Sequence, residues 1–166
     1  MIKYAFFDID GVLSVPRYKD GKKFVVGGTE DWWINYLKKE KEPYKYCGVP
    51  IRLRFLLKQL KDSGVKIAVL SQEPIPEGRV AKKDFIKYRY VGLIDDFNVF
   101  FTDTEKGKVD FLAKFAAENN IKPPEILFVD DTFSIVLAAH NAGFNSHHIS
   151  EFHHIYYSDS YDDNLV

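Results

Sequence analysis

Cysteine is almost missing from this chain of 166 residues, in which Cys47 is the single example. This excludes an intrachain disulfide framework and makes a reducing compartment suitable for the chain. A lone cysteine with no base placed near it by the sequence is more typical of a packed residue than of a nucleophile. We therefore assign Cys47 no catalytic role.

The chain also lacks a long apolar run and an excess of charge of either sign. No segment is long and apolar enough to cross a membrane. The N-terminal residues Met1–Tyr4 lead directly into an apolar strand, without the basic region and long apolar stretch of a secretory leader. Lys and Arg number 23 against 24 Asp and Glu, and this balance gives no sign of nucleic acid as a partner. We expect a cytoplasmic protein.

Apolar residues are plentiful, at 46% of the chain, so one domain with a sizeable core is expected. Short apolar runs alternate with helical patterns, which is typical of βαβ units with helices on both faces of a parallel sheet. The fold class predicted is α/β, doubly wound around a mainly parallel sheet. The predicted strands are Ile2–Phe7, Lys66–Leu70, Val99–Thr102 and Ile126–Val129. The predicted helices run from Pro50 to Gly64, from Val109 to Glu118 and from Thr132 to Gly143.

Two stretches do not fit this alternation. The first lies at about 14–49, and its Asp20-Gly21 pair predicts a β-hairpin flap. An amphipathic helical pattern over Glu30–Glu42 follows and predicts a minimal helical cap. The second stretch, 151–166, is a tail rich in Tyr, Asp and Ser without periodicity, which is typical of partial disorder. We expect a single core domain over 1–150 with a small insertion.

The insertion carries Trp32, Trp33 and Tyr36 on its predicted helix. These aromatic residues fit the core of a short helix, and they equally fit a surface that contacts a substrate or partner. Both interpretations stay open at this point.

Acidic residues follow the first and last apolar runs. Asp8 and Asp10 come directly after the first run, on one side of the strand, and Gly11 allows a sharp departure from the sheet. Asp130 and Asp131 end the last run. Ligands of open parallel sheets bind at the carboxyl ends of the strands, so we expect these carboxylates to converge. A hard divalent cation would relieve their repulsion, and magnesium (Mg²⁺) is the natural candidate.

A magnesium site of this kind suits phosphoryl transfer, because magnesium binds phosphate oxygens. A bound phosphate also needs positive charge and hydrogen-bond donors. Ser71 and Gln72 follow the second apolar run, and Lys106 and Lys108 lie at the start of the second crossover helix. Either lysine could supply the positive charge.

Four segments, in this order, resemble the motifs of the haloacid dehalogenase-like (HAD) superfamily. They are Asp8-Ile9-Asp10-Gly11-Val12-Leu13, Val69-Leu70-Ser71, Lys106 and Phe128-Val129-Asp130-Asp131. The resemblance extends over about Ile2 to Ile149. A single Asp-x-Asp is common by chance, but four motifs in the correct order at strand ends are specific.

The resemblance implies a magnesium-dependent phosphatase that acts through a phospho-aspartate on Asp8. Asp10 would be the general acid and then the general base. Asp8, the backbone carbonyl of Asp10 and Asp131 would hold magnesium, with Asp130 acting through a water. Ser71, with Gln72 beside it, and Lys106 would bind the phosphate. We favour Lys106 over Lys108 because it leads the helix as the family's lysine does.

Alternatives to a phosphatase follow from the same residues. The family's dehalogenases lack the second acidic residue of the first motif, so Asp10 argues against that reaction. A phosphomutase and a non-catalytic binding or regulatory domain stay open. The phosphorylated substrate could be a small molecule or a macromolecule. A short cap leaves the site open, and in the family that the chain resembles this pattern implies either a macromolecular substrate or a homo-oligomer in which a neighbour closes the pocket. For His147, His148, His153 and His154 we favour surface or partly packed positions over a second metal site.

Overall fold

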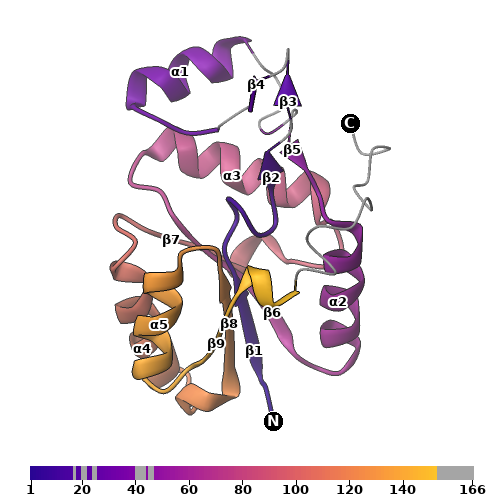
Figure 1. Cartoon of the computed structure of the whole chain (residues 1–166), viewed down its shortest axis with the longest axis vertical. Coiled ribbons are helices and arrows are strands. Elements are labelled where there is room, and N and C mark those ends of the chain that lie inside the picture. The colour runs from indigo at the N-terminus through magenta and orange to yellow at the C-terminus, as the bar shows by residue number, and fades with distance from the viewer. Residues whose placement is uncertain (17, 20–21, 24–25, 40–43, 45–46, 153–166) are drawn as a thin grey trace.

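Five parallel strands form the central sheet of the computed structural model, which describes residues 1–16, 18–19, 22–23, 26–39, 44 and 47–152 (Figure 1). Their order across the sheet is β7-β6-β1-β8-β9. The strands are β1 (Tyr4–Phe7), β6 (Lys66–Gln72), β7 (Val99–Thr102), β8 (Ile126–Asp130) and β9 (Asn145–His148). The prediction of an α/β fold with a mainly parallel sheet is confirmed.

Helices cover both faces of this sheet, as Figure 1 shows. They are α2 (Ile51–Asp62), α3 (Pro76–Arg89), α4 (Gly107–Glu118) and α5 (Phe133–Asn141). Successive residues of a strand point to opposite faces. Phe6 accordingly packs in a cluster with Leu112 of α4, and Phe7 packs with Leu57 of α2 and Phe85 of α3. The two apolar layers show that the sheet is doubly wound.

Short 3-10 helices complete the connections between the larger elements. They are η1 (Asp96–Asn98), η2 (Pro123–Glu125) and η3 (Ile149–Phe152). Within the described residues, no helix has both the length and the apolar character needed to cross a membrane. The predicted tail lies outside the described residues from position 153 onward. The extent of the single core domain stays a prediction.

The segment between the first strand and α2 folds back on itself. Strand β2 (Val15–Pro16) pairs antiparallel with β5 (Cys47–Gly48), so the two ends of the predicted insertion lie side by side. Strand β3 (Tyr18–Lys19) pairs antiparallel with β4 (Lys22–Lys23), as the hairpin signal predicts. The Asp20-Gly21 turn itself lies outside the described residues. Helix α1 (Glu30–Lys39) follows the hairpin.

The aromatic residues of α1 form part of the core. Trp33 is fully buried and Tyr36 is nearly so. Trp32 is half-buried and stacks on Tyr36, with 4.8 Å between ring centroids. Helix α1 lies over α3 beyond the carboxyl ends of the strands (Figure 1). The core interpretation of this cluster therefore holds for Trp33 and Tyr36, and α1 forms a small lid element on α3. Cys47 is buried, as expected of a packed residue.

Helix α3 and strand β9 of the core were not predicted from the sequence. Helix α3 begins with Pro76 and carries Gly78 in its first turn, and both residues lower the expectation of a helix. Pro76 is nevertheless well placed at the first helical position, where no backbone hydrogen bond is lost. Edge strand β9 is made of Asn, Ser and two His residues, which carry no apolar strand signal.

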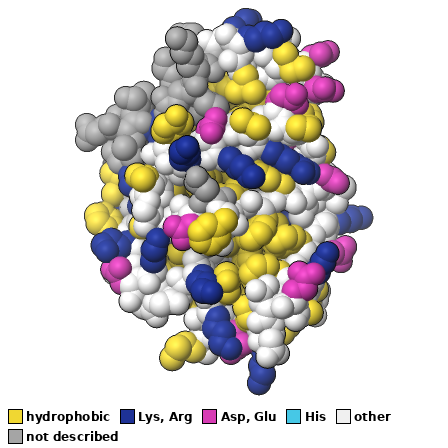
Figure 2. Space-filling model, turned by 180° about the vertical axis from the view of Figure 1, so that it is seen from behind, with side chains coloured by type: hydrophobic (Ala, Val, Ile, Leu, Met, Phe, Trp, Pro, Cys, Tyr) yellow, Lys and Arg dark blue, Asp and Glu magenta, His cyan; other side chains and the backbone are white. Residues whose placement is uncertain are grey.

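Apolar side chains also reach the surface, and Figure 2 shows them gathered on one face among lysine and arginine residues. The large exposed hydrophobic residues of the protein as a whole include Phe55, Val91 and Phe97. Exposed apolar atoms are normal on folded proteins. We assign this face no function.

Candidate active site

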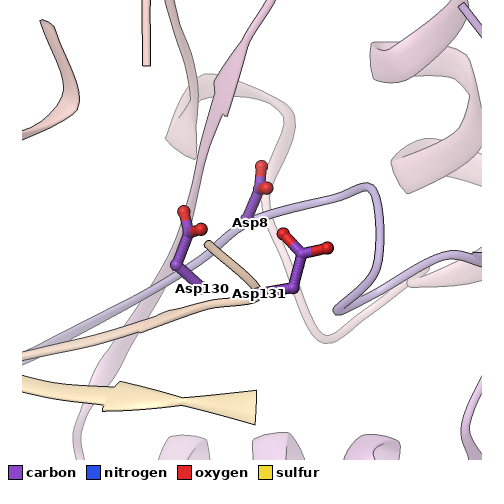
Figure 3. Close-up of side chains that lie close together, drawn as sticks. All are labelled: Asp8, Asp130 and Asp131. Carbon is purple, nitrogen blue, oxygen red and sulfur yellow. The ribbon is translucent and has the colours of Figure 1, made fainter. Parts of the chain in front are cut away.

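The strand register brings the predicted acidic residues to one edge of the sheet. Phe7 of β1 lies beside Val69 of β6 and Val129 of β8. Asp8 directly follows Phe7, and Asp130 directly follows Val129 as the last residue of β8. Figure 3 shows Asp8, Asp130 and Asp131 close together. One carboxylate oxygen from each lies within 4.8 Å of the others, as predicted from the strand ends.

The loop after β1 lets these carboxylates approach one another. Gly11 adopts a φ of +83°, a left-handed conformation that favours glycine. A Cβ atom on Gly11 would overlap the Asp131 carboxylate. The Gly11 amide donates to the Ser14 carbonyl at 2.8 Å, which closes the loop tightly. The glycine is therefore required both by the turn and by the closeness of Asp131.

Lys108, and not Lys106, lies against these carboxylates. The Lys108 Nζ is 3.2 Å from Asp8 Oδ2 and 2.8 Å from Asp130 Oδ2, and the side chain is fully buried. Lys106 is exposed just before the first residue of α4. Residues two apart on a helix point about 200° away from each other, so only one of the two lysines can face the site. This corrects our preference for Lys106.

The charges of Lys108 and Asp8 depend on their burial and on each other. Burial lowers the pKa of Lys108, but the charges of Asp8 and Asp130 outweigh this and raise it above its usual range. Burial, followed by the charges of Asp130 and Asp10, raises the pKa of Asp8 from 3.8 to about 7, against the opposing attraction of Lys108. The ionised Asp8 carboxylate is thus costly in the metal-free protein.

A hard divalent cation fits the donor set. Asp8 Oδ1 is buried and has no hydrogen-bond partner among the described residues. Both carboxylate oxygens of Asp130 already have a hydrogen-bond donor, since Oδ2 accepts from Lys108 and Oδ1 accepts from the Thr132 amide, each at 2.8 Å. Asp131 reaches the surface, and partial burial followed by the charge of Asp130 raises its pKa. An unpartnered carboxylate oxygen beside further carboxylates suits magnesium, which prefers oxygen ligands.

The raised pKa of Asp8 predicts how stability depends on pH in the presence of a chelator. A carboxyl whose pKa is higher in the folded state than in the unfolded state costs stability as pH rises from about 4 to about 7. Asp8→Asn should remove this cost and stabilise the metal-free protein at pH 8 by up to about 4 kcal/mol. Urea denaturation of both proteins at pH 4, 6 and 8 measures the difference.

The comparison isolates Asp8 because the other shifted carboxyls are present in both proteins. Hydrogen bonds lower the pKa of Glu125 and Glu151, so their contribution has the opposite sign and cancels in the difference. A stability difference that is constant from pH 4 to pH 8 would contradict the raised pKa.

Asp10 lines the same pocket as Asp8 and is paired with a lysine that sequence analysis missed. Lys82 of α3 is buried, and its Nζ is 2.9 Å from Asp10 Oδ2. The Asp10 side chain is 43% exposed, so it can reach solvent or a ligand. The buried Tyr44 is close by, and burial, followed by the charge of Asp10, raises the pKa of its hydroxyl well above the usual range.

Ser71 and Gln72 belong to the strand itself, because β6 extends two residues beyond its predicted end. Ser71 is buried, and its Oγ accepts a hydrogen bond from Lys82 Nζ at 3.2 Å. The Gln72 side chain donates to the Asp103 carbonyl at 3.2 Å. A pocket of about 340 Å³ joins these residues to the acidic cluster. Its lining includes Asp8, Asp10, Ser71, Gln72, Lys82 and Asp131, together with 26–28 of the insertion.

Glu73 is a second residue that sequence analysis missed. It follows Gln72 and is buried, with Glu73 Oε2 3.6 Å from Lys82 Nζ. Strand alternation from Ser71 places Glu73 on the same side, a signal that was available in the sequence. Lys82 could be found only after α3 was recognised, since it faces the site from that helix.

Two of the predicted histidines are described, and both are partly packed. His148 Nε2 lies 2.9 Å from the Asp131 carbonyl and its Nδ1 lies 2.6 Å from Ser150 Oγ. His147 contacts the carboxylate of Glu151 at 2.8 Å. His153 and His154 lie outside the described residues. Over the described part of the chain, the group able to hold a metal ion consists of the three aspartates and includes no histidine.

No protein-family model matches the chain, and no curated protein matches it by sequence. Solved structures do resemble it. An aspartate-to-alanine variant of a HAD family enzyme from Bacteroides thetaiotaomicron, in complex with magnesium and inorganic phosphate, is 14% identical with a TM-score of 0.56. The match covers 89% of this chain and 93% of that one.

Two further structures are similar. The 3-deoxy-D-manno-octulosonate 8-phosphate phosphatase from Moraxella catarrhalis, solved in complex with a magnesium ion, a phosphate ion and a KDO molecule, is 17% identical with a TM-score of 0.50. The match covers 87% of this chain and 67% of that one, so this chain spans about two thirds of its length. A predicted HAD-like family hydrolase from Porphyromonas gingivalis is 16% identical with a TM-score of 0.51, and the match covers 89% of this chain and 90% of that one. Taken with the order of the five strands, these likenesses show that the chain has the HAD-like fold that its four motifs implied.

Proposed function

We propose that this chain is a magnesium-dependent phosphatase, a phosphoric monoester hydrolase that acts through a phospho-aspartate on Asp8. The observation that carries the proposal is the environment of Asp8. Asp8 lines an open pocket together with the Asp10–Lys82 pair, its Oδ2 contacts Lys108, and its buried Oδ1 has no hydrogen-bond partner among the described residues. A nucleophile, a proton donor and two cations therefore meet where a phosphate can enter.

The proposed reaction has two steps. In the first, an Asp8 carboxylate oxygen forms a bond to phosphorus, the bond from phosphorus to the substrate oxygen breaks, and Asp10 protonates that oxygen. In the second, Asp10 takes a proton from water, whose oxygen attacks phosphorus and releases Asp8 and phosphate. The partial exposure of Asp10 suits both tasks, since the leaving oxygen and water must each reach it.

Asp8 and Asp131, with the Asp10 backbone carbonyl, would hold magnesium, and Asp130 would act through a water. The hydrogen bonds of Asp130 to Lys108 and the Thr132 amide support this indirect role. When bound, magnesium supplies charge neutralisation and orientation of the phosphate. Lys108 replaces Lys106 in the proposed phosphate site, together with Ser71 and Gln72.

The alternatives differ from this proposal in a measurable way. A phosphomutase needs a pocket that excludes water, whereas the pocket here is open to solvent. A non-catalytic domain has no chemical reason to keep a complete acidic cluster beside a buried lysine. A cytoplasmic location, a homo-oligomer and the choice between small and macromolecular substrates remain predictions.

Phosphate release tests the proposed function. Sugar phosphates, nucleotides, phosphopeptides and an aryl phosphate are each incubated with the protein and magnesium. We expect release from at least one class, support by manganese, and inhibition by calcium, whose larger and more flexible coordination shell misplaces the nucleophile. A chelator should stop the reaction, and excess magnesium should restore it.

Lys108→Met and Lys106→Met form a matched pair for this assay. Loss of activity in Lys108→Met with normal activity in Lys106→Met is expected, because of these two lysines Lys108 is the one that contacts Asp8.

Two outcomes of the phosphate-release assay would contradict the proposed function. Full activity in excess chelator would exclude the metal assignment. Conversion of one phosphate ester into another without net phosphate release would indicate the phosphomutase.

A further inference from the structure

Lys82 is a buried cation that none of the four sequence motifs contains. Its side chain is 5% exposed, and it projects from α3, the helix that sequence analysis missed. A buried ammonium is costly unless charges and acceptors surround it. The contacts of Lys82 must therefore offset the cost of burying its charge in the pocket lining.

The Lys82 ammonium has three N–H donors, and three acceptor atoms lie within 3.2 Å of it. They are Asp10 Oδ2 at 2.9 Å, the Gln72 carbonyl at 2.8 Å and Ser71 Oγ at 3.2 Å. Two of these acceptors belong to β6, and the third belongs to the loop after β1. Because protein atoms engage all three donors, Lys82 is placed to hold protein groups in position more than to bind a substrate.

Glu73 is a buried carboxylate that forms an ion pair with Lys82. Its Oε2 lies 3.6 Å from Lys82 Nζ, and its Oε1 accepts a hydrogen bond from the Ile75 amide at 3.1 Å. Gly78, one helical turn before Lys82, allows this approach, because a Cβ atom there would overlap the Glu73 carboxyl group. The lysine is thus held at both ends, by its helix and by a buried carboxylate.

We propose that Lys82 is a positioning residue that holds the Asp10 carboxylate in a fixed relation to Ser71, and so aligns the proton donor with the bound phosphate. This inference rests on the proposed function for the roles of Asp10 and Ser71. The position of Lys82 itself does not depend on that function. Asp10 lies in a loop and is partly exposed, so without Lys82 its carboxylate would turn toward solvent.

Kinetics on two substrates test this role. Lys82→Met removes the ammonium but keeps a similar volume, and we expect kcat for an alkyl phosphate to fall by about a hundredfold, the typical cost of a misplaced catalytic group. For an aryl phosphate, whose leaving oxygen needs no proton, the first step should change little. KM should change little for both substrates, since protein acceptors engage all three Lys82 donors. Lys82→Arg, which keeps the charge, should restore part of kcat.

Lys83→Met is the matched control, because Lys83 is the next residue of α3 and is exposed. It should behave like the wild type. Lys82→Met leaves Glu73 as an unpaired buried carboxylate, so the double variant Lys82→Met/Glu73→Gln is made in parallel to keep the fold. The same kinetic pattern is expected in both.

Crystal structures of the wild type and of the Lys82 variants decide the proposal independently of turnover. We expect the Asp10 carboxylate to be displaced or disordered in both Met variants and ordered in Lys82→Arg and Lys83→Met. An unchanged Asp10 in the Met variants would overturn the proposal, as would a rise in KM on both substrates with kcat unchanged. A wild type without activity on any phosphate ester would refute the proposed function alone, and the Asp10 position would still decide the role of Lys82.

Discussion

Asp8→Asn should abolish phosphate release while leaving the fold intact. The substitution removes the only carboxylate proposed to attack phosphorus, and it removes one magnesium ligand. Loss of a nucleophile typically lowers kcat by about ten-thousandfold or more. The variant keeps the shape of the side chain, and it relieves repulsion from Asp130 and Asp131, which lie within 4.8 Å.

Steady-state phosphate release with saturating magnesium measures this loss. Asp110→Asn is the control, because Asp110 is an exposed aspartate of α4 that lies two residues after Lys108 and so points away from the site. It should retain wild-type activity. Acid-quenched wild type incubated with substrate should carry a phosphoryl group that hydroxylamine removes, whereas Asp8→Asn should carry none. Magnesium-dependent turnover in Asp8→Asn above a trace would refute the covalent mechanism.

Asp10→Asn should impair the enzyme to an extent that depends on the leaving group. An alkoxide is strongly basic, and general acid catalysis is typically worth about a hundredfold to ten-thousandfold, so release from an alkyl phosphate should fall by that factor. An aryl oxide can leave unprotonated, so formation of the phospho-aspartate from an aryl phosphate should be much less affected. Hydrolysis of the intermediate should then be slow, since Asp10 also activates water.

Rapid mixing with an aryl phosphate should therefore show a burst of aryl alcohol followed by a slow steady state. The backbone carbonyl of Asp10 is unchanged in the variant, so a lost metal ligand would not explain the pattern. Lys82→Met should show a weaker form of the same leaving-group dependence. Equal losses on both substrates, with no burst, would count against the acid and base role of Asp10.

Much of the fold could be predicted from the sequence, because the relevant signals are local. The apolar runs that became β1, β6, β7 and β8 are short and bounded by polar residues, and strand pairing only confirmed them. Asp8, Asp10, Asp130 and Asp131 follow two of these runs directly. Parallel strands end at one edge of a sheet, so a strand assignment alone predicts that these carboxylates meet.

The placement of the site lysines and the pairing of Glu73 depend on contacts between separate segments, which no local sequence pattern predicts. Lys106 and Lys108 look equivalent in the sequence, and the choice between them depends on where α4 begins and which of its faces packs on the sheet. Pro76 and Gly78 have low helix propensity, so α3 was not predicted. Gly78 is nevertheless needed, because a Cβ atom there would overlap the Glu73 carboxyl group. Helix propensity is a property of a single residue, whereas Gly78 is required by its contact with Glu73, five residues earlier in the chain.

Lys82 shows most clearly what only the tertiary structure decided. Its distance to Asp10 is 2.9 Å, across more than seventy residues of sequence, and it is set by the packing of α3 against the end of β6. A lysine in a polar stretch predicts an exposed side chain, because exposure is the usual state of lysine. Here neighbouring carboxylates and a carbonyl offset the cost of burying its charge, and they come together only when the sheet and its covering helix are assembled.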